Sequence, residues 1–375
     1  MSIRIERRLT QPRWLQFAVP LGSIALAFGL MALVLVITGH GPGHTYRRLF
    51  DAAFIANGAL SSTFISATPL AFTGLAAAVA FRMQLFNIGG EGQLYFGSIG
   101  AAAAALLVGG SSTTLLVVVM ILAGALAGAF WALIPGLLRA YLATNEIITS
   151  LMLNYVAGLI ITYLIFDSHS YWRDSSGFEA SVFPQGKPLP DAATWPTLTL
   201  HGAVVPLGFG VAILAALLLW VLYSRTRFGF EVTVIGDSWR AARYAGMRTS
   251  RKIVAVMCIS GAVAGIGGAS QDGDFRHLLD PKGLTAAGYG YTGIVVAALG
   301  RYNPVAAVFV AFLLGGLENA GYTLQGADFP SGLVGVMQGL ILFCTLGGEL
   351  LIRYRVRVSR PARPTAAVPR PETAQ

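Results

Sequence analysis

The sequence RTRFGFEVTVIGDSWRAARYAGMRTSRK, residues 225–252, is the longest basic interruption in an otherwise apolar chain. Seven of these 28 residues are Arg or Lys, and apolar runs long enough to span a membrane flank the stretch on both sides. A loop with this much positive charge stays on the cytoplasmic side of a membrane. Within it we expect a short helix over 237–245, which Asp237 or Ser238 would cap and Gly246 would end.

The composition of the whole chain is that of an all-α, polytopic membrane protein. Of its 375 residues, 55% are hydrophobic and 11% are charged, whereas soluble domains carry about 25% charged residues. Several apolar stretches exceed the roughly 20 residues that cross a hydrocarbon core, and the alternation of a transmembrane barrel is missing. The net charge of +9 does not indicate a nucleic-acid partner, because the basic residues stand at segment ends, where they set orientation.

Ten apolar segments are candidate spans of a transmembrane helix bundle. They cover residues 18–38, 60–81, 88–109, 113–138, 147–166, 203–224, 253–271, 285–300, 304–321 and 332–352. We expect a cytoplasmic segment over 1–17, a transmembrane domain over 18–352 and a disordered basic cytoplasmic tail over 353–375. With both termini inside, 20 of the 26 Lys and Arg residues are cytoplasmic, as the positive-inside rule requires. The segment 285–300 is barely long enough to cross, so a crossing and a re-entrant loop both remain open.

The longest predicted external loop runs over 167–202 and carries Tyr171, Trp172, Trp195 and four prolines. One interpretation is a connector with an aromatic belt at the membrane surface. The other is a docking surface for an external partner, since loops often carry function. The sequence does not separate the two.

Signals for catalysis and for metal binding are scarce. The chain has no G-x-x-x-x-G-K-[ST] phosphate loop and no H-E-x-x-H sequence. All five histidines lie in predicted external loops, and the residues between His40 and His44 are Gly-Pro-Gly, which argues against a helix there. We therefore expect neither an enzyme active site nor a metal site in this chain.

Carboxylates inside the predicted spans are the strongest polar signals, because a charge in the membrane is expensive. The candidates are Glu91, Glu146, Glu318 and Asp272. Glu91 stands in FNIGGEGQ, residues 86–93, whose glycines favour an unwound start of a helix. Glu91 has either a structural role, as a cap or a partner of Arg82, or a place on a polar translocation pathway with Asn87 and Gln93.

Two further groups are candidates for the same pathway. Asn145 and Glu146 open the fifth span, and Thr149, Ser150 and Asn154 follow. The spacings of four, from 145 to 149 and from 150 to 154, place polar groups along one side of a helix, which should face the bundle interior. Interhelical hydrogen bonding is the alternative there. Tyr289 and Tyr291 offer rings that would stack on a flat or sugar-like ligand, or that belong to an aromatic belt at the outer end of the eighth span.

Four motifs together resemble permease subunits of bacterial ABC importers. They are FNIGGEGQ (86–93), NEIITSLMLNY (145–155), AARYAG (241–246) and GYGYTGIVVAALGRYNP (288–304). The branch they resemble is the simple-sugar and nucleoside type, in the wider group of ribose and branched-chain amino-acid permeases. The resemblance implies a multi-pass protein of the bacterial cytoplasmic (inner) membrane. It would translocate nucleosides, foremost of the purine type, or related simple sugars by alternating access.

The resemblance also assigns a role to the basic loop. Permeases of ABC importers carry an E-A-A-x-x-x-G helix that docks into a groove on the ATPase. Here Ala241, Ala242 and Gly246 occupy the motif positions, and Arg240 stands where the family has Glu. With Asp237 at the expected helix start, these are the predicted coupling residues. The small alanines would allow close approach to the partner.

The implied assembly contains a second permease subunit, commonly a different chain, two ABC ATPase subunits, an external substrate-binding protein and the surrounding membrane lipid. ATP and magnesium would bind to the ATPase, so no cofactor is expected on this chain. The alternative is an ion-coupled secondary transporter without an ATPase, in which Glu91, Glu146 and Glu318 carry protons. The basic loop argues against it, since a carrier that acts alone needs no docking helix.

Overall fold

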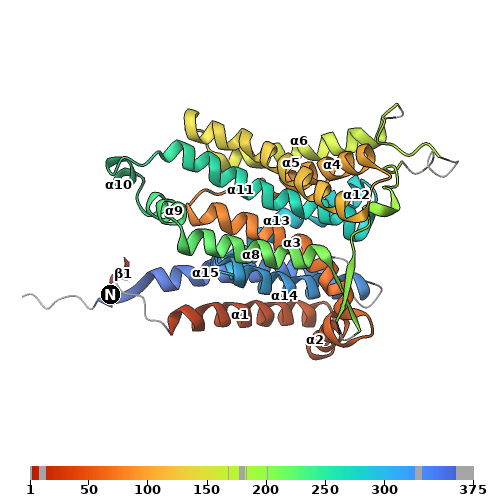
Figure 1. Ribbon diagram of the computed structural model, residues 1–375. Helices are drawn as coiled ribbons and strands as arrows, with labels where there is room; N and C mark the ends of the chain where they lie inside the picture. Colours follow the sequence, from red (N-terminus) through yellow and green to blue (C-terminus); the bar gives the residue numbers. More distant parts are fainter. Residues whose placement is uncertain are drawn as a thin grey trace, which may run out of the picture.

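The computed structural model describes residues 2–7, 14–167, 169–176, 182, 184–200, 202–325 and 332–359. Long helices run side by side through the molecule, as Figure 1 shows. The helices that match predicted spans are α1 (Leu15–Ile37), α3 (Ala59–Arg82), α4 (Gly90–Val108), α5 (Thr113–Leu142), α6 (Glu146–Phe166), α8 (Leu207–Arg225), α11 (Thr249–Ser270), α13 (Tyr289–Leu299), α14 (Pro304–Thr323) and α15 (Leu333–Arg353). The other elements are β1 (Ser2–Arg7), α2 (Pro42–Phe50), η1 (Asp51–Ile55), η2 (Asp191–Ala193), β2 (Thr197–Leu200), β3 (Ala203–Pro206), α9 (Arg227–Asp237), α10 (Trp239–Tyr244), η3 (Gln271–Arg276), α12 (Pro281–Ala287) and β4 (Tyr354–Ser359).

The predicted all-α class is confirmed. Among the described residues, seven helices are long and apolar enough to cross a membrane, or eight if α1 and α2, which bend by 120° at their junction, form one span. The number of about ten spans therefore stays a prediction. One local expectation was wrong: a helix does begin between His40 and His44, because Pro42 takes the first helical position, where its missing N–H costs nothing.

The predicted span 285–300 is two short helices, α12 and α13, that cross the bundle in two steps. Lys282 in α12 lies 5.5 Å from the ring of the last residue of α6, at the end of the bundle away from α10. The Tyr289 carbonyl at the start of α13 accepts a hydrogen bond from Thr73, in the middle of α3, at 2.9 Å. After α13 the ring of Tyr302 lies 5.7 Å from Phe81, in the last turn of α3. Eleven residues rise only about 16 Å, so α13 begins at mid-depth.

The centre of the bundle is α3, because 83% of its apolar window is buried, compared with 22% for α6. Glycines allow a very close crossing between α5 and α11. A Cβ atom on Gly265 would lie 2.1 Å from the carbonyl oxygen of Gly124, and one on Gly128 would lie 2.8 Å from Gly265. Such close backbone approach is how helices associate in lipid. The similar pair Gly335 and Gly339 has no neighbour within 4 Å.

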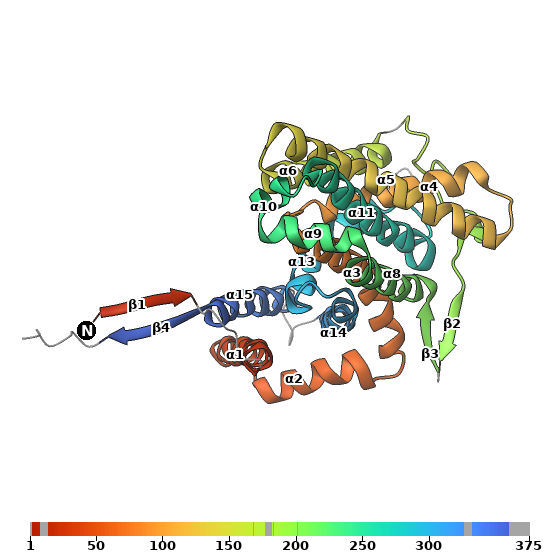
Figure 2. The same cartoon turned by 60° about the vertical axis from the view of Figure 1, so that its left-hand side comes forward.

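The two ends of the described chain lie together at the α10 end of the bundle (Figures 1 and 2). There β1 pairs antiparallel with β4, from Ser2 opposite Ser359 to Arg7 opposite Tyr354. Residues 354–359 of the predicted disordered tail are thus a strand, because a partner strand far away in sequence satisfies their backbone. Residues 360–375 lie outside the described part.

The loop between α6 and α8 lies at the opposite end of the bundle (Figure 1). Trp195 in this loop is 1% exposed, and its backbone N–H donates to the Gly273 carbonyl at 2.9 Å. Both interpretations of the loop are therefore wrong for this residue, which anchors the loop in the core. Tyr171 remains 59% exposed, with the Lys187 ammonium 3.7 Å from its ring centre.

Candidate functional site

A short non-helical segment, residues 83–89, returns from the end of α3 and runs beside the first turns of α6 to mid-depth. Its backbone is satisfied by α6 side chains: Ser150 accepts from the Ile88 N–H at 3.2 Å, and Asn154 donates to the Ile88 carbonyl at 2.8 Å. The Asn154 oxygen also accepts from the Gly92 N–H at 2.9 Å. Irregular backbone at membrane depth needs such partners. The polar face predicted on α6 is thus engaged in interhelical hydrogen bonds.

The start of α6 has a structural task as well. Asn145 is exposed and caps the helix by accepting from the Ile147 N–H at 2.9 Å. Glu146 is 6% exposed and pairs with Arg139 at 3.2 Å, while it accepts from the Phe86 N–H at 3.4 Å. Their predicted place on a translocation pathway stays a prediction.

Asn87 and Gln93 form a buried amide pair beside α11. The Asn87 amide donates to Gln93 at 3.1 Å and to the Ser260 hydroxyl at 2.9 Å, and Gln93 donates back to Asn87 at 3.0 Å. Ser260 in turn donates to the Ala76 carbonyl of α3 at 2.7 Å. This network ties the non-helical segment to α3, α4 and α11.

Glu91 joins the starts of two helices at mid-depth. Its carboxylate accepts from the Tyr95 hydroxyl at 2.6 Å and from the Gly290 N–H at the start of α13. A carboxylate is favoured at a helix N-terminus. The approach is so close that a Cβ atom on Gly290 would lie 2.2 Å from the Glu91 nitrogen. The guanidinium of Arg82, which was one of the alternative partners considered for Glu91, lies 5.2 Å from the ring centre of Tyr223.

The two tyrosines of α13 differ in exposure. Tyr289 is 8% exposed and Tyr291 is 42% exposed. Because α13 begins at mid-depth, neither ring stands at the membrane surface, and the aromatic-belt interpretation is wrong. Tyr291 lies near Asn154 and Tyr155, which is 63% exposed, so both rings belong to a face of the bundle that this chain leaves open.

The basic loop contains two helices, α9 and α10. Ser238 caps α10 by accepting from the Ala241 N–H at 3.3 Å, whereas Asp237 is the last residue of α9. Gly246 ends the element with φ = +74°, a conformation that costs glycine least. The structure therefore contains the predicted N-cap of α10, which is Ser238, and the predicted glycine at its C-terminal end.

The sequence predicted that both alanines of α10 contact a partner, but the exposed face of the helix carries other residues as well and leaves out Ala242. Ala242 is fully buried inside the chain, so its predicted contact with a partner is wrong. Arg240 and Ala241 are exposed. Tyr244 is 94% exposed and Trp239 is 37% exposed. Sequence reasoning missed both aromatics, although exposed Trp and Tyr in a short projecting helix are typical interface residues.

The two remaining candidate carboxylates, Asp272 and Glu318, differ in their surroundings. Asp272 in η3 is completely buried, and both its carboxylate oxygens lie within 2.9 Å of the Ser98 hydroxyl of α4. Glu318 of α14 has one carboxylate oxygen that is buried without a hydrogen-bond partner. The part of the chain that the structure describes contains no group of three His, Cys, Asp or Glu residues that would hold a metal ion.

A protein-family model described as the permease component of a branched-chain amino acid transport system matches residues 59–346. The chain belongs to this permease family. The match contains all of the helices that build the polar network, and it places the chain among multi-pass membrane proteins of transport systems rather than among enzymes.

Three curated relatives align over most of their length. A glucose ABC transporter permease protein of Haloferax volcanii is 34% identical, with 96% of this chain and 94% of the relative covered. A guanosine ABC transporter permease protein of Bacillus subtilis is 33% identical, with 86% and 91% covered. A nucleoside ABC transporter permease protein of Lactococcus lactis is 30% identical, with 87% and 89% covered. Each relative is named as a permease of an ABC transporter.

Proposed function

We propose that this permease is the membrane-spanning subunit of an ABC importer that takes up nucleosides or simple sugars across the cytoplasmic membrane. The observation that carries the proposal is the nearly full-length similarity to ABC transporter permeases that are named for glucose, guanosine and nucleosides. The identities of 34% and 33% do not separate a sugar from a nucleoside. The proposed substrate class is therefore a compound with a sugar ring, with or without a base.

In this proposal, hydrolysis of ATP takes place on a separate ATPase that binds α10. The exposed rings of Trp239 and Tyr244 and the exposed guanidinium of Arg240 form the proposed contact surface. Aromatic residues and arginine dominate the binding energy of protein interfaces. Gly246 keeps its predicted role of ending the helix, and Ala242 holds α10 onto the rest of the chain.

The proposed pathway lies along the open face beside Tyr291, where a second permease subunit would complete it. The buried residues Asn87, Glu91 and Gln93 shape this face by fixing the starts of α4 and α13. They do not line it directly in this conformation. A substrate-binding protein would deliver the compound at the end of the bundle opposite α10.

Transport by the reconstituted assembly tests the function. We expect proteoliposomes with this chain, its companion permease, the ATPase and the binding protein to take up labelled nucleoside or sugar only with ATP. Competition by unlabelled guanosine, ribose and glucose then identifies the class. Uptake by this chain alone, driven by a proton gradient without the ATPase, would instead establish the secondary transporter.

A further inference from the structure

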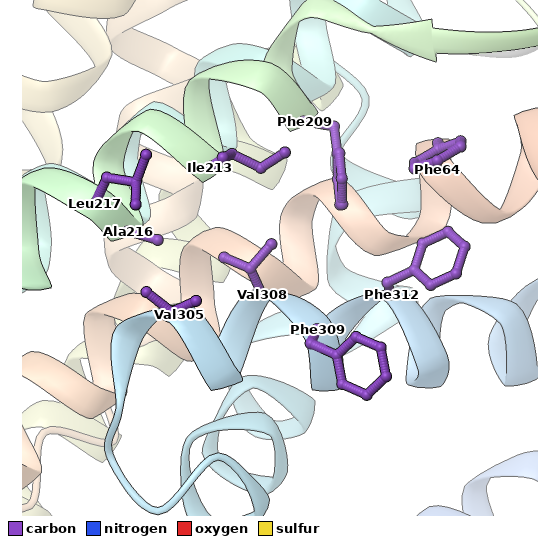
Figure 3. A pocket seen from close by; sticks show the side chains of 9 residues that line it. All are labelled: Phe64, Phe209, Ile213, Ala216, Leu217, Val305, Val308, Phe309 and Phe312. Carbon is purple, nitrogen blue, oxygen red and sulfur yellow. The ribbon is translucent and has the colours of Figure 1, made fainter. Parts of the chain in front are cut away.

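An apolar groove lies on the flank of the bundle between α3, α8 and α14 (Figure 3). Its nine lining residues are Phe64, Phe209, Ile213, Ala216, Leu217, Val305, Val308, Phe309 and Phe312. The volume of the groove is about 430 Å³, within the roughly 300–1,000 Å³ of small-molecule pockets. No polar side chain lines it, so any ligand that it holds is held by hydrophobic contact.

The groove has the depth and the shape of a site for a hydrocarbon chain. All three helices that form it qualify as membrane spans, which places the groove at hydrocarbon depth. From Phe209 to Leu217, α8 rises about 12 Å. The rings of Phe64, Phe209 and Phe312, whose centres lie 5.0–6.3 Å apart, close the end away from α10. A groove whose lining extends about 12 Å along α8 suits one acyl chain.

The end of the groove toward α10 is marked by basic and aromatic residues. Trp220 lies one turn beyond Leu217 on α8 and is 39% exposed, with the Arg225 guanidinium 6.0 Å from its ring centre. Arg301, which is exposed, precedes the lining residue Val305 of α14 by four residues. Trp and Arg gather at membrane interfaces, and basic pockets between transmembrane helices bind anionic lipid head groups.

We propose that this groove binds one acyl chain of an anionic phospholipid from the leaflet at the α10 end, with Arg225 and Arg301 holding its head group. A transmembrane helix of another subunit fits less well, because helices pack closely through small residues and only Ala216 in the lining is small. The proposal does not depend on what the permease transports.

Native mass spectrometry of the full-length chain tests the site directly. The chain is expressed in membranes that contain anionic and zwitterionic phospholipids and is purified in mild detergent. We expect one phospholipid to stay bound, and the anionic type to be enriched several-fold over its share in the membrane. Ala216→Trp, which fills the groove, should abolish this retention. Leu214→Trp, on a 56% exposed face of α8 outside the lining, is the matched control and should retain the lipid.

Two further variants keep the proposal falsifiable. Ala216→Leu fills less of the groove and should weaken retention if Ala216→Trp fails to fold. Changing both Arg225 and Arg301 to Gln should remove the anionic preference and leave acyl-chain binding in place. Equal retention by the Ala216 and Leu214 variants would overturn the proposal. A second result would also overturn the proposal: the unaltered chain carries no phospholipid, and the Ala216→Leu variant no longer retains another membrane subunit. This result would assign the groove to a helix of that subunit.

Discussion

Replacing Glu91 by alanine should destabilise the permease, because two buried donors then lose their acceptor. The Tyr95 hydroxyl lies 2.6 Å from the Glu91 carboxylate, and the Gly290 N–H donates to it as well. A buried donor that is left unsatisfied costs about 1–3 kcal/mol. Two such donors give an expected loss of roughly 2–6 kcal/mol in the free energy of unfolding. Glu91→Gln keeps one acceptor oxygen and should lose about half as much.

A second substitution turns this into a rescue experiment. Tyr95→Phe in the Glu91→Ala background removes one stranded donor, so the double variant should regain about 1–3 kcal/mol over Glu91→Ala. The matched control is Glu231→Ala, which breaks a partly exposed ion pair with Lys252 at 2.6 Å. Partly exposed pairs contribute little, so we expect a loss of at most about 1 kcal/mol. Thermal unfolding of the purified variants in one detergent provides the ranking.

The order of melting temperatures decides the matter. We expect the control to lie nearest to the unaltered protein, Glu91→Gln and the double variant to lie between, and Glu91→Ala to lie lowest. A double variant that melts no higher than Glu91→Ala would refute the hydrogen-bond account of this junction. So would a Glu91→Ala protein as stable as the Glu231→Ala control.

Three further predictions concern packing, coupling and the amide pair. Gly290→Ala should lower the melting temperature, because a methyl group there collides with α4 and overpacking costs about 1–3 kcal/mol. The control Gly210→Ala should leave the melting temperature unchanged, because a methyl group there has nothing within 4 Å. Equal melting temperatures of the two variants would contradict this prediction. Tyr244→Ala should reduce stimulation of the ATPase without changing thermal stability. Ala242→Leu, at a buried position, should lower thermal stability without reducing stimulation of the ATPase. A Tyr244→Ala variant that stimulates the ATPase fully would exclude the exposed face of α10 as the contact surface. Ser260→Ala should cost about 1–3 kcal/mol in thermal unfolding, and an unchanged midpoint would show that its two hydrogen bonds contribute nothing.

The sequence predicted the helices well because the length of an apolar run is a local property. It also located the end of α10, since a glycine with positive φ is a local signal as well. What it could not supply were partners far away in the chain. Glu91 meets Gly290 across 199 residues and Asn87 meets Ser260 across 173. Nothing within either motif specifies these pairings.

The sequence predicted burial wrongly in α10, where neighbouring residues lie on different faces of a short helix. Ala241 and Ala242 are adjacent in the motif, yet only Ala242 is buried. Which side of a six-residue helix faces its own chain depends on the packing of α9 and α11, and not on the helix sequence. Trp195 was misjudged for the same reason, because its loop folds back onto η3.

The helix α10, which is the proposed coupling helix, and the meeting point of α4 and α13 are joined by a continuous physical route. α11 begins at Thr249, shortly after α10 ends, and its Ser260 binds both the non-helical segment, through Asn87, and α3. The glycine contacts of Gly265 lock α11 to α5. We therefore expect these two helices to move together, because closely packed backbones resist sliding past each other. α6 is held to the segment mainly by side-chain hydrogen bonds, which break and re-form at lower cost. We expect a displacement of α10 to be taken up between α6 and the segment, beside the open face that carries Tyr291.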